Sequence, residues 1–530
     1  IMAWDRRWMA DDGLIVVRSV REILAGHGPV YSAFERAEPT TSTLWMWLVA
    51  GCGWITGGDV AQLALGVGGL LAVGGLAIAL DATRRFHRAS GHAGGLWPAG
   101  AWVVIGMFPF WDFATSGLET GLAFFWLAGI WWLLVTLRPD SGRRRLAGFA
   151  VFVGLGPLVR PELALATAVF LAAGLWIART PRRRALWLAG LALALPLAYE
   201  VFRAGYYGTL VPLPALAKRA SHAEWGRGYE YLMRLVKPHL LYAPAAVLAA
   251  VVVANRRTIV APHRVVFAAP VVAASLVALY VIRVGGDFMH ARLLLPATFL
   301  MVAPVLLVPR GRWIGPAVAL VTAWGLFTGI WFYAGAQHLY RDERLDCTRY
   351  TRQRNPTTEA DHLGIQPYLP TNVRDALRQG RRLLLSETGD QIAMSAAHDA
   401  PVAVAVGRLG VGGAVAPIDG IVVDRLGLAN PLGARITPTQ PGRTGHEKSL
   451  PWAWILADFA DPSTTPEALR PAVQAARHAM TCGELAELLA SVRAPMTASR
   501  FWANLTGALR RTRLIIPADP ALAERALCGP

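Results

Sequence analysis

The sequence predicts a polytopic α-helical membrane protein that carries a separate α/β domain at its C-terminal end. Of the 530 residues, 54% are hydrophobic and only 16% are charged, and the mean hydropathy is +0.38. This composition excludes an ordinary soluble enzyme. After Tyr340 the long apolar runs stop, and Asp, Glu, Asn, Thr and Pro become common. We therefore predict a transmembrane domain at 1–337 and a soluble domain, a candidate carbohydrate-binding domain, at 338–530.

The basic residues predict the topology. The formal net charge is +17, but Lys and Arg fall in short clusters between apolar runs rather than over one soluble face, which argues against a nucleic-acid partner. By the positive-inside rule these clusters mark cytoplasmic loops. They are Arg84, Arg85 and Arg88; Arg143 to Arg145; Arg182 to Arg184; Arg256, Arg257 and Arg264; and Arg310 with Arg312.

Nine apolar runs alternate between these loops and less basic ones, and each predicts one crossing. They are 96–111, 118–137, 146–158, 163–178, 185–203, 240–254, 265–283, 293–308 and 313–335. The run 43–80 is about twice one ~20-residue span, so we predict a membrane-dipping helix at 43–57 and one crossing at 60–80. Segment 1–42 and the soluble domain then lie outside the cytoplasm. Because segment 1–42 needs a way across the membrane, we expect a further helix ahead of this sequence.

The soluble domain has its own local signals. Short apolar runs at Leu383–Leu385, Val402–Val406 and Ile421–Val423 predict strands, and 466–492 predicts helix. These patterns indicate a small α/β domain.

Three of the four cysteines lie in the soluble domain and allow one disulfide. We favour Cys482 with Cys528, because Cys347 lies close to the last membrane helix. The cysteines and histidines do not have the spacing of a zinc site.

Two adjacent carboxylates, Asp11 and Asp12, are the strongest functional signal. Charged side chains are costly near a bilayer, so a carboxylate pair where the chain meets the membrane indicates chemistry, with a solvated loop as the alternative. The residues that follow, 14–24, have the spacing of a helix lying in the membrane interface. At headgroup depth such carboxylates can deprotonate an acceptor hydroxyl, stabilise an oxocarbenium-like centre or hold a divalent cation such as Mg, Mn or Ca.

A second polar motif precedes the apolar run that starts at Leu293. Arg292 and His290 are candidates for clamping a donor phosphate at the membrane boundary, with Asp287 beside them. The alternative is that Arg292 extends to the interface and pairs with Asp287.

Further candidates for donor binding lie on the other predicted outer loops. Arg160, Glu162 and Glu119 put charges at the bilayer edge, and Tyr207 with Lys218 combines an aromatic ring with a cation. Structural ion pairs and interfacial anchors are the competing interpretations.

Two tryptophans in the soluble domain, Trp452 and Trp454, are candidates for acceptor binding. Alternate residues point the same way on an extended segment, so the two rings would form a platform for a sugar. Core packing and contact with the membrane surface are the alternatives.

An outer-loop Asp pair, an interfacial helix, a multi-span bundle and an extracytoplasmic C-terminal domain resemble the GT-C glycosyltransferases, which use polyprenyl-phosphate sugars. More narrowly, the chain is similar over essentially its whole length to mycobacterial terminal β-(1→2) arabinofuranosyltransferases of the AftB type. The segments that carry this resemblance are Asp11–Arg18, Leu24–Tyr31, Glu35–Arg36, Thr41–Trp45, Gly286–Met289 and Val423–Pro431. One departure is Pro212–Pro214, where related enzymes often carry Pro-Asn-Thr, which puts a donor contact through that Asn in doubt.

The resemblance implies transfer of arabinofuranose from decaprenyl phosphoarabinose to arabinan ends in arabinogalactan or lipoarabinomannan, forming β-1,2 linkages during cell-wall synthesis. It implies a plasma-membrane enzyme whose active site, with Asp11 and Asp12 as catalytic residues, faces the periplasm. Donor and product would both be β-linked, so the reaction would retain the configuration of the anomeric carbon. Retention needs either a covalent glycosyl-enzyme intermediate on an Asp or attack by the acceptor on the same face, with the leaving phosphate as base.

Other functions stay open from the sequence. A mannosyltransferase using polyprenyl phosphomannose has the same architecture, and only a substrate test separates the two. A transporter of lipid-linked sugar would place polar groups near mid-membrane and show internal repeats, whereas the charged motifs here collect at one face. A non-catalytic scaffold that binds arabinan through the soluble domain is disfavoured by the Asp pair.

Overall fold

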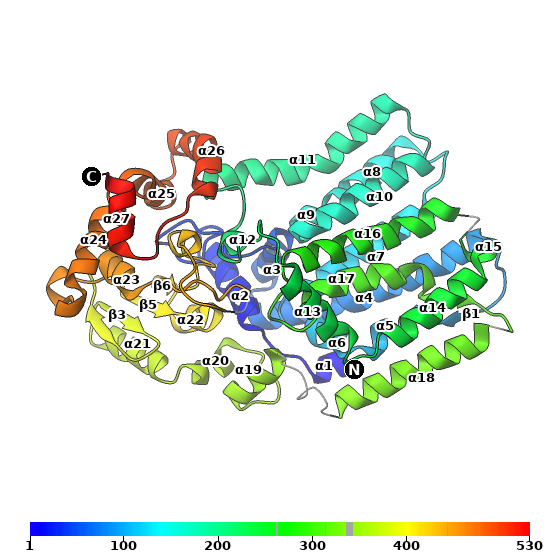
Figure 1. The fold of residues 1–530 in the computed structure, drawn as a ribbon, viewed down its shortest axis with the longest axis horizontal. Coiled ribbons are helices and arrows are strands. Elements are labelled where there is room, and N and C mark those ends of the chain that lie inside the picture. Colours follow the sequence, from blue (N-terminus) through cyan, green and yellow to red (C-terminus); the bar gives the residue numbers. More distant parts are fainter. Residues whose placement is uncertain (261–262, 313, 335–342, 443, 530) are drawn as a thin grey trace.

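The computed structural model describes residues 1–260, 263–312, 314–334, 343–442 and 444–529. A bundle of helices occupies one end of the molecule, and a smaller domain built around a sheet occupies the other (Figure 1). The predicted boundary between 337 and 338 lies outside the described residues.

Four helices among the described residues are long and apolar enough to cross a membrane, so the chain fits a membrane protein. They are α4 (Val60–Ala89), α11 (Arg182–Tyr206), α16 (Arg264–Arg283) and α18 (Ile314–Tyr333). Shorter apolar helices accompany them: α3 (Thr43–Thr56), α7 (Thr120–Thr136), α10 (Ala164–Ile177), α14 (Tyr242–Ala254) and α17 (Leu295–Val302). Seven predicted crossings therefore correspond to single helices, and the predicted elements at 43–57 and 60–80 are two separate helices.

Three predicted crossings are broken into shorter pieces. Run 96–111 divides into α5 (Gly100–Gly106) and α6 (Phe108–Ala114), and run 146–158 divides into α8 (Arg143–Gly154) and α9 (Gly156–Val159). Run 293–308 contains α17 between short 3₁₀ turns. Proline stands in the first turn of α6, α9 and α17. Because proline has no N–H to donate, it begins a helix readily but does not continue one.

Small residues bring the bundle helices close together. A side chain at Gly121 of α7 would place its Cβ 2.1 Å from the carbonyl oxygen of Gly68 in α4, and one at Gly75 would lie 2.8 Å from the amide nitrogen of Phe125. Close backbone approach through glycine is the usual way in which helices associate in a membrane.

The predicted cytoplasmic loops include two that meet at one end of the bundle. Strand β1 (Leu96–Pro98) pairs antiparallel with β2 (Leu307–Pro309), which brings the clusters around Arg85 and Arg310 together at the end away from the sheet (Figure 1). This arrangement is consistent with the predicted topology, while the orientation in a membrane stays a prediction.

The soluble domain is built on a four-stranded sheet with the order β4–β3–β5–β6. Its strands are β3 (Leu383–Ser386), β4 (Gln391–Ala393), β5 (Val402–Val406) and β6 (Ile421–Asp424). β3, β5 and β6 run parallel, and β4 is an antiparallel edge strand. The three predicted strands are confirmed. β4 was not predicted, because three residues carry too little of a pattern.

Helices cover both faces of the sheet, which explains why β5 is apolar at every position. On one face Leu385 and Val404 pack with α21 (Tyr368–Arg378) and α22 (Leu409–Val415). On the other face Leu384 and Ala403 pack with α23 (Trp452–Phe459), α24 (Arg470–Met480) and α25 (Gly483–Arg493). The helical prediction for 466–492 is confirmed as α24 and α25. The remaining helices are α1 (Met2–Asp5), α12 (Leu213–Ala217), α13 (Trp225–Val236), α15 (Arg256–Ile259), α19 (Glu343–Thr351), α20 (Glu359–His362), α26 (Ala498–Arg513) and α27 (Pro520–Cys528).

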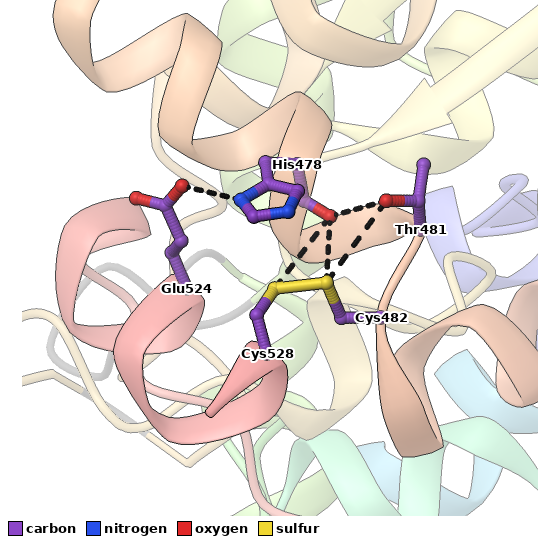
Figure 2. The surroundings of a disulfide bond; sticks show 5 residues. All are labelled: His478, Thr481, Cys482, Glu524 and Cys528. Carbon is purple, nitrogen blue, oxygen red and sulfur yellow. Dashed lines mark hydrogen bonds and ion pairs between the residues drawn. A yellow bond between two sulfur atoms is a disulfide. The ribbon is translucent and has the colours of Figure 1, made fainter. Parts of the chain in front are cut away.

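The predicted disulfide between Cys482 and Cys528 is confirmed. It ties the start of α25 to the end of α27, and a His478–Glu524 pair with a nitrogen–oxygen distance of 2.7 Å lies beside it (Figure 2). Among the described residues, His478 and these two sulfur atoms are the one metal-like cluster of His, Cys, Asp and Glu side chains. Disulfide sulfurs are not thiolates, so this cluster is not a metal site.

The predicted helix after the Asp pair is α2 (Asp11–Leu24), which lies between the bundle and the soluble domain (Figure 1). Most of its residues are buried, including Arg18 and Glu22, which are 0% exposed. The prediction of a helix is therefore confirmed. Its burial contradicts a helix whose apolar face lies against lipid, while its depth in a membrane stays a prediction. Both of its faces pack against protein, because the soluble domain covers the polar face that the sequence pattern predicted to be exposed to water.

α2 lies alongside α22 and places opposite charges at the two ends of that helix. Asp11 accepts N–H groups from Gly410 (3.3 Å) and Val411 (2.9 Å) at the start of α22. Arg18 donates to the carbonyls of Ala416 (2.8 Å) and Pro417 (2.9 Å) just after its end. An acid at a helix N-terminus and a base at its C-terminus complement the helix dipole. This contact, which we call the α2–α22 clamp, joins the two domains.

We predict that Arg18→Met destabilises the protein by ~3–5 kcal/mol, because it removes the guanidinium that lies 2.8 Å from the buried carboxylate of Glu22 and leaves this carboxylate with the imidazole of His27. Thermal unfolding of the purified protein in detergent measures this. Arg21→Met is the matched control, since Arg21 is one-third exposed and its pair with Glu359 contributes about 1 kcal/mol or less. Equal unfolding temperatures for the two variants would contradict the prediction.

Candidate active site

A cavity of about 310 Å³ lies where α2, the bundle and the soluble domain meet. Asp11 and Asp12 line it from α2. The bundle contributes segments around Glu119, Arg160, Lys218 and Asp287, and the soluble domain contributes 346–350, 407–411 and 444–446. The cavity therefore has one wall from each domain, and the Asp pair stands at their junction.

A chain of ion pairs fixes the carboxylates on the bundle wall. Arg292 lies with Nη1 3.1 Å from Oδ2 of Asp12 and Nη2 3.2 Å from Oε1 of Glu119. Arg160 pairs with the same Glu119 and with Glu162. All five side chains line the cavity. The structure thus brings together predicted residues that come from separate loops.

Asp287 extends this network. Its carboxylate lies 3.6 Å from Nη1 of Arg292 and 3.5 Å from Nζ of Lys218. Gly286, in the turn before it, has φ +70°, and a Cβ there would lie 2.3 Å from Cγ of Tyr231. Only glycine fits this turn. The Gly-Gly-Asp sequence therefore places Asp287 by backbone geometry.

Neighbouring charges shift the pKa values of two buried carboxyl groups of the cavity in opposite directions. Burial raises the pKa of Asp11, and the neighbouring Asp12 raises it further, while the N–H groups of α22 oppose this shift. Burial also acts to raise the pKa of Asp287, but Lys218 and Arg292 outweigh it and lower that pKa. Asp287 is thus held ionised, whereas Asp11 takes up a proton more readily than an ordinary Asp.

His290 is not brought to the cavity with Arg292. Its ring stacks on Phe108 with centroids 5.3 Å apart and lies 5.6 Å from the ring of His239. It is 5% exposed and does not line the cavity. The predicted phosphate clamp of Arg292 with His290 therefore has no support, because the turn at Ala291, with φ +60°, directs these neighbours to different surroundings.

Tyr207 also lies away from the cavity. Its hydroxyl donates to the carbonyl of Pro29 at 2.6 Å, and its ring packs edge-on against Tyr206 with centroids 4.9 Å apart. It ties the end of α11 to the segment after α2. Among the predicted donor-binding residues, His290 and Tyr207 are thus outside the cavity lining.

The predicted tryptophan platform is wrong. Trp452 and Trp454 begin α23, and residues two apart on a helix point in nearly opposite directions. Trp454 is fully buried, with its indole N–H donating to the carbonyl of Ala518 at 2.9 Å. Pro451 ahead of the pair favours a helix start rather than a strand. Neither ring lines the cavity.

Two residues of the soluble domain that were not predicted do line the cavity. The guanidinium carbon of Arg408 lies 4.2 Å from the ring centroid of Tyr350, which is 49% exposed. Nothing in their local sequence distinguishes them from surface residues, because only the docking of the two domains brings them to the Asp pair.

A cation at Asp11 and Asp12 would find few free protein ligands. No set of three His, Cys, Asp or Glu ligand atoms converges there within the described part of the chain. Both oxygens of Asp11 accept N–H groups from α22, and Arg292 lies against Asp12. A divalent cation prefers six or more oxygen ligands, so an ion here needs most of its ligands from a substrate.

Comparison with known proteins identifies the family of the chain. The profile described as "AftB family C-terminal domain" matches residues 384–524. The terminal beta-(1->2)-arabinofuranosyltransferase of Mycobacterium tuberculosis is 35% identical, with 99% of this chain and 95% of the relative covered. The protein of the same name from Corynebacterium glutamicum is 33% identical, with 97% of this chain and 84% of the relative covered. No solved structure matches. The chain therefore belongs to the terminal β-(1→2)-arabinofuranosyltransferase family and is a glycosyltransferase.

Proposed function

We propose that the protein transfers arabinofuranose from decaprenyl phosphoarabinose to the ends of arabinan in arabinogalactan or lipoarabinomannan, forming β-1,2 linkages at the periplasmic face of the plasma membrane. The observation that carries this proposal is the cavity at the Asp pair, which has one wall from the bundle and one from the soluble domain. The bundle wall gives a lipid-linked donor access from the membrane. The soluble domain gives a polymeric acceptor access from outside. The assignment to the GT-C fold belongs to the same proposal.

Within this proposal the two aspartates have different roles. Asp12 has 21% of its side chain exposed, and its Oδ2 lies 3.1 Å from Nη1 of Arg292. We assign to Asp12 the contact with the anomeric carbon or the acceptor hydroxyl. Asp11 is held by Gly410 and Val411, so it positions its neighbour and the soluble domain.

The acidic wall suits the chemistry of glycosyl transfer. An oxocarbenium-like transition state carries positive charge at the anomeric carbon. Asp12, Glu119 and Asp287 surround Arg292 there and supply fixed negative charge. Retention of the anomeric configuration then follows in one of two ways. Either Asp12 forms a covalent glycosyl-enzyme intermediate, or the acceptor attacks the face that the phosphate leaves, with the phosphate as base. A mannosyltransferase would use the same wall, so an assay with each donor is needed to distinguish arabinose from mannose transfer.

We expect Asp12→Asn to lower kcat by ~10²–10⁴-fold, because it removes the reacting carboxylate. Asp11→Asn should lower it less, because the amide oxygen still accepts one N–H from α22. The assay uses purified protein, decaprenyl phosphoarabinose and a short arabinofuranoside, with NMR of the new linkage. Asp399→Asn, at an exposed position of the soluble domain, is the control. Full activity of Asp12→Asn would contradict this role, and use of phosphomannose alone would overturn the donor assignment.

We expect Arg292→Lys to lower kcat by ~10–100-fold, because a lysine cannot bridge Asp12 and Glu119 as the planar guanidinium does. Steady-state kinetics with both substrates measures this. Arg234→Lys is the control, since Arg234 is exposed. An unchanged kcat in Arg292→Lys would show that this bridge does not position the reacting carboxylate.

A divalent cation at Asp11 and Asp12 stays a prediction. Since the protein offers few free ligand atoms there, we expect Mg²⁺, Mn²⁺ or Ca²⁺ to bind measurably only when donor or polyprenyl phosphate is present. Calorimetric titration of each ion into the protein, with and without decaprenyl phosphate, tests this. Tight binding by the protein alone that Asp12→Asn abolishes would contradict it.

A further inference from the structure

One cation that lines the cavity forms no ion pair with a described carboxylate. Six carboxylates and four Lys or Arg side chains line the cavity within the described residues. On the bundle wall, Arg160, Arg292 and Lys218 are each ion-paired, and the carboxylates that pair with them are Asp12, Glu119, Glu162 and Asp287. Three cations thus face four anions. A phosphodiester, which carries one negative charge, gains little from such a wall.

Arg408 differs from these cations. No carboxylate of the described residues is ion-paired with it, and its guanidinium carbon lies 4.2 Å from the ring centroid of Tyr350. Stacking on an aromatic face holds a guanidinium without using its N–H donors. Those donors stay available, and they match the oxygens of a phosphate in a two-pronged geometry.

The position of Arg408 in the fold also favours it as a phosphate ligand. It stands directly before α22, whose first N–H groups hold Asp11. Arg408 therefore lines the cavity from the soluble domain, whereas Arg292 lines it from the bundle, and both Asp11 and Asp12 line the same cavity. A donor that crosses this junction can place its anomeric carbon at the acidic wall and its phosphate at Arg408.

We propose that Arg408, oriented by Tyr350, binds the phosphate of the lipid-linked donor. This inference rests on the proposed function for its donor class, and it moves the phosphate from the bundle cations to the soluble domain. As the bond between the anomeric carbon and the phosphate oxygen breaks, its electron pair stays on the phosphate. The acceptor oxygen bonds to that carbon, and the acceptor's proton ends on the phosphate. Negative charge thus grows at Arg408 while positive charge grows beside Asp12.

The direct test is binding of decaprenyl phosphate, the lipid product, to the purified full chain. Arg408→Met should weaken binding on the order of 10-fold or more and raise the KM for the donor similarly, with the acceptor KM unchanged, because a charge-assisted contact is lost. Arg408→Lys should retain part of the affinity. Tyr350→Phe, which keeps the ring, should bind decaprenyl phosphate several-fold more tightly than Tyr350→Leu, because the ring orients the guanidinium. Arg381→Met, at an exposed arginine of the same domain, is the control.

Each outcome bears on the inference. Unchanged lipid binding in Arg408→Met, with unaltered thermal unfolding, overturns it. A raised acceptor KM with normal donor KM also overturns it and assigns Arg408 to the acceptor. If wild type binds decaprenyl phosphate through Arg408 but transfers no arabinose, the phosphate site stands and the proposed function fails. If wild type transfers arabinose and Arg408→Met does so equally well, the function stands and the phosphate site fails.

Discussion

The α2–α22 clamp is the contact on which the rest of the site depends. Asp11 and Arg18 lie two turns apart on α2 and meet the two ends of the short helix α22, so they fix both the distance and the register between bundle and soluble domain. Gly410 permits this approach, because a Cβ there would lie 2.0 Å from the carbonyl oxygen of Asp11. Since the cavity has a wall from each domain, loss of this contact would remove the cavity as well as weaken the fold.

The clamp also explains why two adjacent aspartates have unlike surroundings. In the first turn of a helix, neighbouring side chains point about 100° apart. Asp11 therefore faces α22, while Asp12 faces the bundle and Arg292. Burial of so many charges is costly unless each is paired. The ion-pair chain through Glu119 and Arg160 meets that requirement, and it leaves the bundle wall suited to a developing cation rather than to a phosphate.

Much of the local structure follows directly from sequence patterns. The strands at 383–385, 402–406 and 421–423 were predicted because short apolar runs indicate strands. Predictions failed where the same sequence pattern was compatible with two local structures. Trp452 and Trp454 alternate as on a strand, yet they start a helix after Pro451. His290 is two residues from Arg292 but packs on Phe108, because a left-handed residue between them changes the direction of the chain.

The sequence by itself determined the membrane-protein class and the helix after the Asp pair. It also favoured one of the possible disulfides and singled out Asp11 and Asp12 together, because composition, periodicity and residue chemistry are local properties. Tertiary structure alone decided that α2 is buried between two domains, that Glu119, Arg160, Asp287 and Lys218 converge on one cavity, and that Arg408 joins them. The physical reason is that ion pairing and domain docking act between residues hundreds of positions apart. No local pattern records which charges will find partners and which will stay unneutralised.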